Sequence, residues 1–276
     1  MGTLQVVATP IGNLEDVTLR ALRVLGEAEL LLAEDTRRTR VLLDRHGIPA
    51  RPRSLHAHNE AARRDEVLAA LAAGRRVVLV SDAGTPLVSD PGGRLVTAAL
   101  AAGHRVEAVP GPSAPLAALV ASGLPAEAFT FLGFPPRKPG PRDALFARHA
   151  RRPETLVLFE APSRLAGTLA ALAGSFGPER PACVARELTK LHEEVARGSL
   201  AELALRFAEG ARGEVTVVVA GAEDADVDPD FDLDAAVRER LADGASPREI
   251  AAELAPAAGR PRREVYARAL ALREAP

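Results

Sequence analysis

The sequence predicts an α/β protein with two layered domains and a small C-terminal helical domain. Short apolar runs typical of strands alternate with stretches in which apolar residues recur every three or four positions, as in helices lying on a sheet. A Pro- and Gly-rich segment, 110–115, divides this alternation into two halves. An acidic stretch then separates both halves from a final segment of helical character.

The expected strands are spread over both halves of the chain. They are 4–8, 30–33, 76–80 and 105–109 in the first half, and 129–134, 155–159, 182–185 and 215–221 in the second. Helical periodicity is clear over 59–73 and 162–172. We therefore expect an N-terminal α/β domain over 1–112 and a second α/β domain over 113–221.

The remainder of the chain begins with the acidic stretch. Seven acidic residues and no basic one lie between Glu223 and Asp234, which predicts a solvated linker over 222–231. Three short helices are expected over 232–276. One of them begins at Ser246-Pro247-Arg248-Glu249, which has the form of a capping box, and Gly244 and Gly259 are placed to end helices.

Composition limits the class of protein. The 276 residues are 47% hydrophobic and contain no run of eighteen apolar residues, so we expect a globular, cytoplasmic protein. The single cysteine, Cys183, excludes an internal disulfide framework and is expected to be a small buried residue. His56 and His58 form the one close histidine pair, but no third ligand of suitable spacing is evident, and we expect no metal.

Four loops that follow expected strands are rich in Gly, Pro, Ser, Thr and Asp: 9–13, 81–93, 110–115 and 133–141. In open α/β sheets, ligands bind beyond the carboxyl ends of the strands, where such residues bring bare backbone groups close to a ligand. A single loop of this composition is explained by the ordinary preference of turns for these residues, whereas four such loops at corresponding strand ends favour a binding site. The fingerprints of nicotinamide Rossmann enzymes, P-loop NTPases and serine hydrolases do not occur in the sequence.

These loops resemble those of the tetrapyrrole-methylase-like S-adenosylmethionine-dependent methyltransferases. The matching segments are VATPIGNLEDVTLRAL (7–22), AEDTRRTRVLL (33–43), HNE (58–60), VSDAGTPLVSDPG (80–92), VPGPSA (109–114), FLGFPPRK (131–138), FEAPSRL (159–165), ARELTKLHEEVARG (185–198) and GEVTVVVAG (213–221). Within the family, the likeness is to the branch that methylates the 2′-O of a cytidine ribose in the decoding centre of bacterial 16S ribosomal RNA. Corrinoid methylases usually carry a Gly-Pro-Gly-Asp first loop, and this chain has Pro10 to Asp16 there.

The resemblance implies that S-adenosylmethionine lies in the cleft between the two α/β domains. The residues it implies as contacts are Pro10, Ser81, Asp82, Ala83, Gly84, Thr85, Val88, Ser113, Ala114, Phe134, Glu160, Leu188, Glu214, Val215 and Thr216. It further implies that the protein forms a homodimer and that its partner is 16S rRNA in the small ribosomal subunit. We expect it to bind neither DNA nor a membrane.

A ribose hydroxyl that accepts a methyl group must lose its proton to a nearby group. We expect Lys190, Glu34 and Glu60 to include that group, although Glu60 lies in a segment that suits a helix cap equally well. The residues expected to position RNA are Arg37, Arg38, His58, Lys138, Arg164, Arg186, Arg262 and Arg263. For the last two, a solvated helix face explains the sequence as well as RNA contact does.

Two alternatives remain open at this point. A methylase of a corrinoid or another small anionic substrate would keep the cofactor site and change the acceptor. A protein that binds RNA or the cofactor without catalysis would have the same loops and no turnover.

Overall fold

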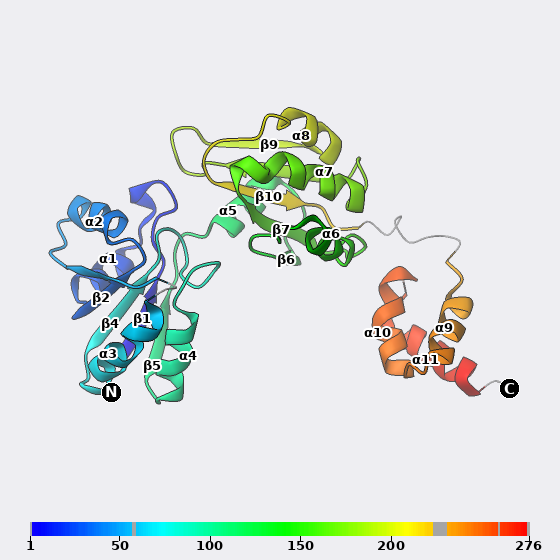
Figure 1. The fold of residues 1–276 in the computed structure, drawn as a ribbon, viewed down its shortest axis with the longest axis horizontal. Coiled ribbons are helices and arrows are strands. Elements are labelled where there is room, and N and C mark those ends of the chain that lie inside the picture. The colour runs from blue at the N-terminus through cyan, green and yellow to red at the C-terminus, as the bar shows by residue number, and fades with distance from the viewer. Residues whose placement is uncertain (1, 57–58, 223–230, 259, 275–276) are drawn as a thin grey trace.

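The computed structural model describes residues 2–56, 59–222, 231–258 and 260–274, which form two α/β units and a group of C-terminal helices (Figure 1). The predicted fold class is confirmed. The exact boundaries at residues 112 and 221 stay predictions. The expected acidic linker falls almost wholly outside the described residues.

The first sheet is parallel throughout, in the order β3-β2-β4-β1-β5. Its strands are β1 (Thr3–Val7), β2 (Leu30–Ala33), β3 (Pro52–Ser54), β4 (Arg76–Val80) and β5 (Arg105–Val109). The helical segments between them are η1 (Leu14–Asp16), α1 (Leu19–Gly26), α2 (Thr36–Arg45), α3 (Glu60–Ala72) and α4 (Gly93–Ala101). Because all five strands run the same way, the loops that follow them gather along one edge of the sheet.

Both faces of this sheet are buried, which explains its uninterrupted apolar runs. Successive side chains of a strand point to opposite faces. Leu30 and Leu32 therefore join the core that α3 and α4 cover, and Leu31 and Ala33 join the core that α1 and α2 cover.

The second sheet has the order β6-β7-β10-β8-β9, with β6 parallel to β7 and the other pairs antiparallel. Its strands are β6 (Phe129–Phe131), β7 (Thr155–Glu160), β8 (Pro181–Arg186), β9 (Glu194–Ser199) and β10 (Val215–Val219). α5 (Ala114–Ser122) covers one face, where Cys183 is buried as expected. The core on the other face includes side chains of α6 (Pro139–Ala147), α7 (Leu165–Phe176) and α8 (Leu200–Arg206). The short η2 (Pro162–Arg164) precedes α7.

Two strands were not expected from the sequence, β3 and β9. Both lie at an edge of their sheet and pair with one neighbour only. β3 reads Pro-Arg-Ser, in which no residue is fully buried, and β9 reads EVARGS, in which only Ala196 is fully buried. Edge strands bury less surface than central ones, so their apolar signal is weak.

The three expected C-terminal helices are present as α9 (Leu233–Ala242), α10 (Pro247–Ala257) and α11 (Arg262–Glu274). They share a core that includes Leu233, Val237, Ile250 and Val265. The predicted capping box opens α10: Ser246 N–H donates to Glu249 Oε2 at 2.8 Å, and Glu249 N–H donates to Ser246 Oγ at 3.3 Å. Gly244 follows α9 with a φ of 82°, whereas Gly259 lies outside the described residues. Within the described part of the chain, no helix is long and apolar enough to cross a bilayer.

Candidate active site between the two α/β domains

The loops at the carboxyl edge of the first sheet are fastened to one another. Thr9 and Gly84 exchange two backbone hydrogen bonds of 2.9 Å, and Thr85 Oγ1 donates to the carbonyl of Pro112 at 3.1 Å. Gly84 has a φ of 72°, in the left-handed region that favours glycine, and a Cβ there would lie 3.3 Å from Cγ2 of Ile11. The glycine thus lets two loops meet at the floor of a pocket.

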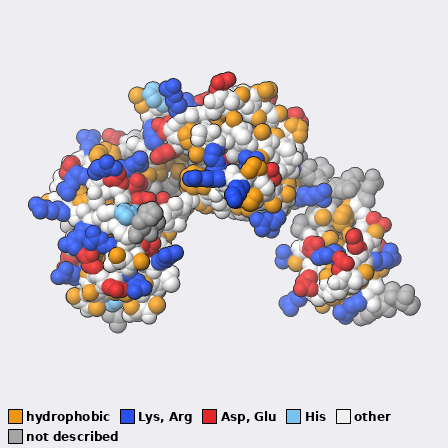
Figure 2. Space-filling model, viewed as in Figure 1, with side chains coloured by type: hydrophobic (Ala, Val, Ile, Leu, Met, Phe, Trp, Pro, Cys, Tyr) orange, Lys and Arg blue, Asp and Glu red, His pale blue; other side chains and the backbone are white. Residues whose placement is uncertain are grey.

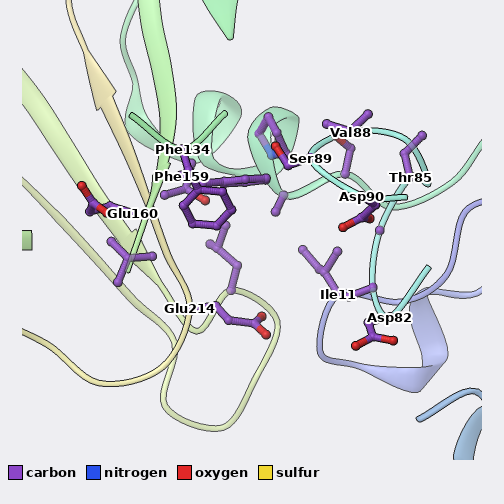
Figure 3. Close-up of a pocket in the computed structure, with 18 of the residues that line it drawn as sticks. Ile11, Asp82, Thr85, Val88, Ser89, Asp90, Phe134, Phe159, Glu160 and Glu214 are labelled. Atoms are coloured by element: carbon purple, nitrogen blue, oxygen red, sulfur yellow. The ribbon is translucent and has the colours of Figure 1, made fainter. Parts of the chain in front are cut away.

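This pocket has a volume of about 460 Å³ and lies between the two α/β domains. In Figure 3, Ile11, Asp82, Thr85, Val88 and Asp90 form one side, and Phe134, Phe159, Glu160 and Glu214 form the other. Of the residues that the resemblance implied as cofactor contacts, those that line it are Asp82, Ala83, Gly84, Thr85, Val88, Ser113, Ala114, Phe134, Glu160, Leu188, Glu214, Val215 and Thr216.

Pro10 and Ser81 are buried beside the pocket without lining it. Ser81 Oγ instead donates to the carbonyl of Ala83 at 3.3 Å, within its own loop. The lining residues that were not named individually as expected contacts are Ile11, Ser89, Asp90, Pro115, Phe159, Ala161, Pro162, Ala185 and Gly213. The first four of these lie in loops 9–13, 81–93 and 110–115, which were expected at a binding site. Phe159 and Ala185 are the cross-strand partners of Thr216, so the register of the second sheet would have shown them.

Aromatic side chains form the wall contributed by the second sheet. The ring of Phe159 lies 5.0 Å from that of Phe131 in an edge-to-face arrangement and 5.4 Å from that of Phe134. Phe134 is 56% exposed, an unusual state for a phenylalanine, and it lines the pocket. It offers an apolar surface that a flat ligand would cover.

Three carboxylates face the pocket from the first domain: Glu34, Asp82 and Asp90. Burial raises the pKa of Glu34, and the charges of Asp82 and Asp90 raise it further. Burial likewise raises the pKa of Asp90. A hydrogen bond with the Ser81 side chain acts against this rise, and the charge of Asp82 adds to it. The cluster is therefore an electrostatic environment suited to a positively charged ligand.

Arg38 is the arginine that lines the same pocket, and it bridges the two domains. Its Nε lies 3.7 Å from Oδ2 of Asp82, and its Nη1 lies 4.0 Å from Oε1 of Glu214. Asp82 is held in place by accepting the N–H of Asp35 at 2.8 Å. Arg37, the neighbouring candidate for RNA contact, instead pairs with Asp35 and holds the pKa of that carboxyl at about 2.

Lys190 lies beside the pocket rather than in its lining. Its Nζ donates to Oε1 of Glu187 at 2.8 Å and to Oε2 of Glu214 at 3.0 Å. Burial acts to lower the pKa of Lys190, but these two carboxylates raise it overall. The ammonium group is therefore held in its charged form, in which it donates hydrogen bonds and accepts no proton.

Glu60 is buried at the start of α3, outside the pocket lining. Its Oε1 accepts the N–H of Leu95 at 3.0 Å and so satisfies a free amide in the first turn of α4. Asn59 does not cap α3. Its Oδ1 accepts from His56 N–H at 2.8 Å, and its Nδ2 donates to Ser54 O at 3.1 Å.

The remaining candidates for RNA contact fall into two groups. Arg164 and Arg186 are engaged within the protein: Arg164 Nη2 donates to the carbonyls of Pro135 and Pro136 at 3.0 and 3.2 Å, and Arg186 pairs with Glu194. Lys138, Arg262 and Arg263 are exposed and make no ion pair with any described residue. His58 lies outside the described residues, which contain no cluster of His, Cys, Asp and Glu that could hold a metal ion.

The fold and the pocket define a protein of two α/β units with a pocket between them, and comparison with known proteins gives its family. The family model described as Tetrapyrrole (Corrin/Porphyrin) Methylases matches residues 3–204. The chain belongs to the tetrapyrrole methylase family, as the resemblance of its motifs predicted.

Relatives with assigned names cover nearly the whole chain. A protein of Mesorhizobium japonicum named Ribosomal RNA small subunit methyltransferase I is 47% identical over 98% of this chain and 92% of its own length. A protein of the same name from Synechocystis sp. is 43% identical over 99% of both chains.

Solved structures agree on the fold. Uroporphyrin-III-C-methyltransferase from Thermus thermophilus matches with a TM-score of 0.57 and 27% identity, over 80% of this chain and 94% of that one. A uroporphyrin-III C-methyltransferase from the same organism, complexed with S-adenyl homocysteine, matches with a TM-score of 0.55 and 25% identity, over 79% of this chain and 97% of that one.

Proposed function

We propose that this protein is an enzyme that transfers the methyl group of S-adenosylmethionine to the 2′-O of a cytidine ribose in 16S rRNA of the small ribosomal subunit. The observation that carries the proposal is the acidic and partly aromatic pocket between the two domains. It occurs in a chain whose relatives, named Ribosomal RNA small subunit methyltransferase I, match over almost their full length.

The residues of the pocket fit the cofactor. A sulfonium and an ammonium group suit the negative cluster of Glu34, Asp82 and Asp90, and an adenine ring suits the aromatic wall at Phe134 and Phe159. Where the loops at Thr9 and Gly84 meet, the absence of a side chain on Gly84 lets a ligand come close to backbone N–H and C=O groups. The related structure with S-adenyl homocysteine supports the same choice of ligand. When bound, the cofactor supplies a methyl group on a positively charged sulfur.

Glu34 is the best placed of the three candidates for proton transfer. As the ribose oxygen bonds to the methyl carbon and the carbon–sulfur bond breaks, the hydroxyl proton must pass to a base within hydrogen-bond reach. Glu34 lines the pocket, and its raised pKa makes it a stronger base than an ordinary carboxylate. Lys190 instead positions Glu187 and Glu214, and Glu60 supports α4.

We propose a cytoplasmic location, because that is where ribosomal RNA is methylated in bacteria, and a homodimer, which rests on the family resemblance alone. Arg38 and Lys138 remain candidates for RNA contact near the pocket. Arg262 and Arg263 remain candidates on the C-terminal helices.

A second candidate function is methylation of a tetrapyrrole. The uroporphyrin-III-C-methyltransferases favour it, because they share the fold at 27% identity. The identity to the proteins named as ribosomal RNA methyltransferases is much higher, so the RNA substrate is the stronger proposal.

The test is methyl transfer from methyl-labelled S-adenosylmethionine by the purified protein. One reaction contains small ribosomal subunits from cells that lack this gene, and the other contains uroporphyrinogen III. The proposal predicts label in 2′-O-methylcytidine after the 16S rRNA is digested to nucleosides. Label in the tetrapyrrole alone would overturn it, and cofactor binding without transfer to either acceptor would indicate a protein that binds without catalysis.

A further inference from the structure

We propose that Arg137, Lys138, Arg148, Arg151 and Arg152 form a phosphate-binding surface for the RNA whose ribose enters the pocket. We call these five residues the α6 basic surface, because they precede and follow α6. This inference rests on the proposed function, since it identifies where the same RNA substrate would be held.

The five side chains are exposed and free of internal partners. None of them makes an ion pair or a side-chain hydrogen bond with any other described residue. Arg142, on α6 itself, differs because it pairs with Asp143 at 3.0 Å. The charge of an unpaired cation is not offset by a neighbouring carboxylate, and its binding to an RNA phosphate releases counterions condensed on the RNA.

Pairing is common among arginines elsewhere on this protein. Arg206 pairs with Glu194 at 2.7 Å, and Arg240 pairs with Glu253 at 2.8 Å. A solvated helix face would be expected to show the same mixture of signs. Segment 137–152 instead has six Lys and Arg residues against the single acidic Asp143, in a chain of net charge −2.

One histidine lies close to two of these arginines. His149 lies between Arg148 and Arg152, and burial together with these two charges lowers the pKa of its imidazole. Burial is the larger cause, and the charges of the two arginines act in the same direction. Figure 2 shows Lys and Arg side chains gathered over the second domain around α6.

The surface begins next to the pocket. Arg137 follows Phe134, a pocket residue, by three positions, a separation of at most about 11 Å along the chain. Arg164 fixes the intervening Pro135 and Pro136 by donating to both of their carbonyls. A nucleotide that enters the pocket past Phe134 would therefore bring a flanking phosphate to Arg137 and Lys138. Arg148, Arg151 and Arg152 precede β7, whose other end at Glu160 lines the pocket, so they would meet phosphates farther along the same RNA.

The composition of the protein favours this mode of RNA contact. Aromatic residues make up 3% of the chain and tryptophan is absent from it, so extensive stacking on bases is not available. Phosphate contacts fix the register and orientation of a nucleic acid without reading its bases. The α6 basic surface would therefore position the RNA, and the pocket would select the reacting ribose.

The experiment compares three sets of substitutions in the full chain. The first is Arg148→Gln with Arg151→Gln and Arg152→Gln, and the second is Arg137→Gln with Lys138→Gln. The control is Arg51→Gln with Arg75→Gln. Arg51 and Arg75 are also exposed and without an ion pair to the described residues, but they lie on the first domain, before β3 and β4, and not on the domain that carries α6.

Binding to small ribosomal subunits is measured at salt concentrations between about 50 and 200 mM. The logarithm of the affinity falls linearly with the logarithm of the salt concentration, and each phosphate contact contributes ~0.7–0.9 to the steepness of that slope. The triple variant is expected to lower the slope by about 2 and to raise the KM for subunits at least about tenfold, with kcat unchanged. Calorimetry with S-adenosylhomocysteine should give wild-type affinity for every variant, which shows that each is folded.

An unchanged salt slope and KM in the triple variant, or an equal loss in the control, would overturn the inference. Its failure is distinguishable from failure of the proposed function. If methyl transfer occurs and is unaffected by the substitutions, the proposed surface is overturned and the proposed function stands. If subunit binding depends on the surface but no methyl transfer occurs, the surface stands and the proposed function is overturned. If the wild-type protein binds no subunits, both proposals are overturned.

Discussion

The backbone N–H of Asn13 donates a hydrogen bond of 3.0 Å to Oγ1 of Thr189 and so joins the two α/β domains. Asn13 lies in the loop after β1, and Thr189 lies in the loop between β8 and β9. Thr189 has a φ of 66°, a conformation that costs a non-glycine residue free energy and that the surrounding contacts must maintain. The contact lies beside the pocket lining residue Leu188, so it sets how closely the two loops approach there.

Gly12 is required for this approach. A Cβ at this position would lie 2.5 Å from Cγ of Lys190 and 2.9 Å from the carbonyl oxygen of Leu188. We expect Gly12→Ala to push the loops apart and to weaken cofactor binding about tenfold or more, since overpacking of a close contact costs about 1–3 kcal/mol. The matched control is Gly26→Ala, where a Cβ meets nothing within 4 Å. Equal cofactor affinity of the two variants by calorimetry would show that the contact does not shape the site.

Gly84 tests the floor of the pocket. Gly84→Val and Gly74→Val both place a β-branched residue at a positive φ, 72° and 80° respectively, so both should lose stability by at least about 1–2 kcal/mol. Gly74 has open space around its Cβ position and lies in the turn before β4, away from the pocket. Only the Gly84 variant should lose cofactor binding by calorimetry. Loss in both variants would assign the effect to the backbone and not to the pocket.

Glu34→Gln tests the proposed proton acceptor. We expect kcat to fall by about 10²–10⁴-fold with little change in cofactor affinity, because general base catalysis contributes on that order. The wild-type rate should rise with pH through the pKa of Glu34, which burial and neighbouring charges raise above 4.5. A variant that keeps the wild-type rate and pH profile would exclude Glu34 as the base.

The same substitution affects stability with a defined sign. A carboxyl whose pKa is raised by folding binds its proton more tightly in the folded state, so its ionised form opposes folding at pH values above that pKa. Glu34→Gln should therefore raise the melting temperature at neutral pH, and the gain should vanish as the pH falls through the unfolded value near 4.5. Thermal melts at a series of pH values measure this. A gain that is independent of pH would contradict the electrostatic cause.

Glu60→Ala tests whether Glu60 stabilises α4 or takes part in catalysis. The substitution leaves the buried N–H of Leu95 without its acceptor, which costs about 1–3 kcal/mol. We expect a lower melting temperature with kcat retained at temperatures where the variant is folded. A large loss of kcat with an unchanged melting temperature would instead place Glu60 in the catalytic machinery.

The C-terminal helices α9 to α11 pack on a core of their own, which includes Val237, Ile250 and Val265. Deletion of residues 229–276 should therefore leave cofactor affinity unchanged, because no pocket residue belongs to the deleted part. If Arg262 and Arg263 contact RNA, the deletion weakens binding to small ribosomal subunits. Unchanged subunit binding would mean that these arginines form a solvated helix face.

The sequence predicted the parts of the fold whose signal is local. Strands such as β2 and β4 are buried on both faces, so each reads as a short apolar run. The capping box at Ser246 involves groups three residues apart, and its two hydrogen bonds are present as expected. Thirteen of the fifteen expected cofactor contacts line the pocket, and their loops had been identified by the family resemblance.

The partners of individual side chains could not be predicted, because they come from distant parts of the sequence. Glu60 meets Leu95, which is 35 positions away, and Arg164 meets Pro136, which is 28 positions away. Arg164 was therefore expected to contact RNA, although its guanidinium group holds the loop at Pro135 and Pro136. The unpaired arginines after α6 belong to no family motif, and the sequence alone does not show that they lack partners among the described residues.

The most direct test of the central claim is a crystal structure of the full chain grown with S-adenosylhomocysteine. The account predicts density for the ligand between the 82–90 loop of the first domain and Glu214 to Thr216 of the second, with its adenine near Phe134 or Phe159 and its amino group or sulfur near the carboxylates of Glu34, Asp82 and Asp90. Density for the ligand at any other place, or an empty interdomain pocket at saturating ligand, would contradict it.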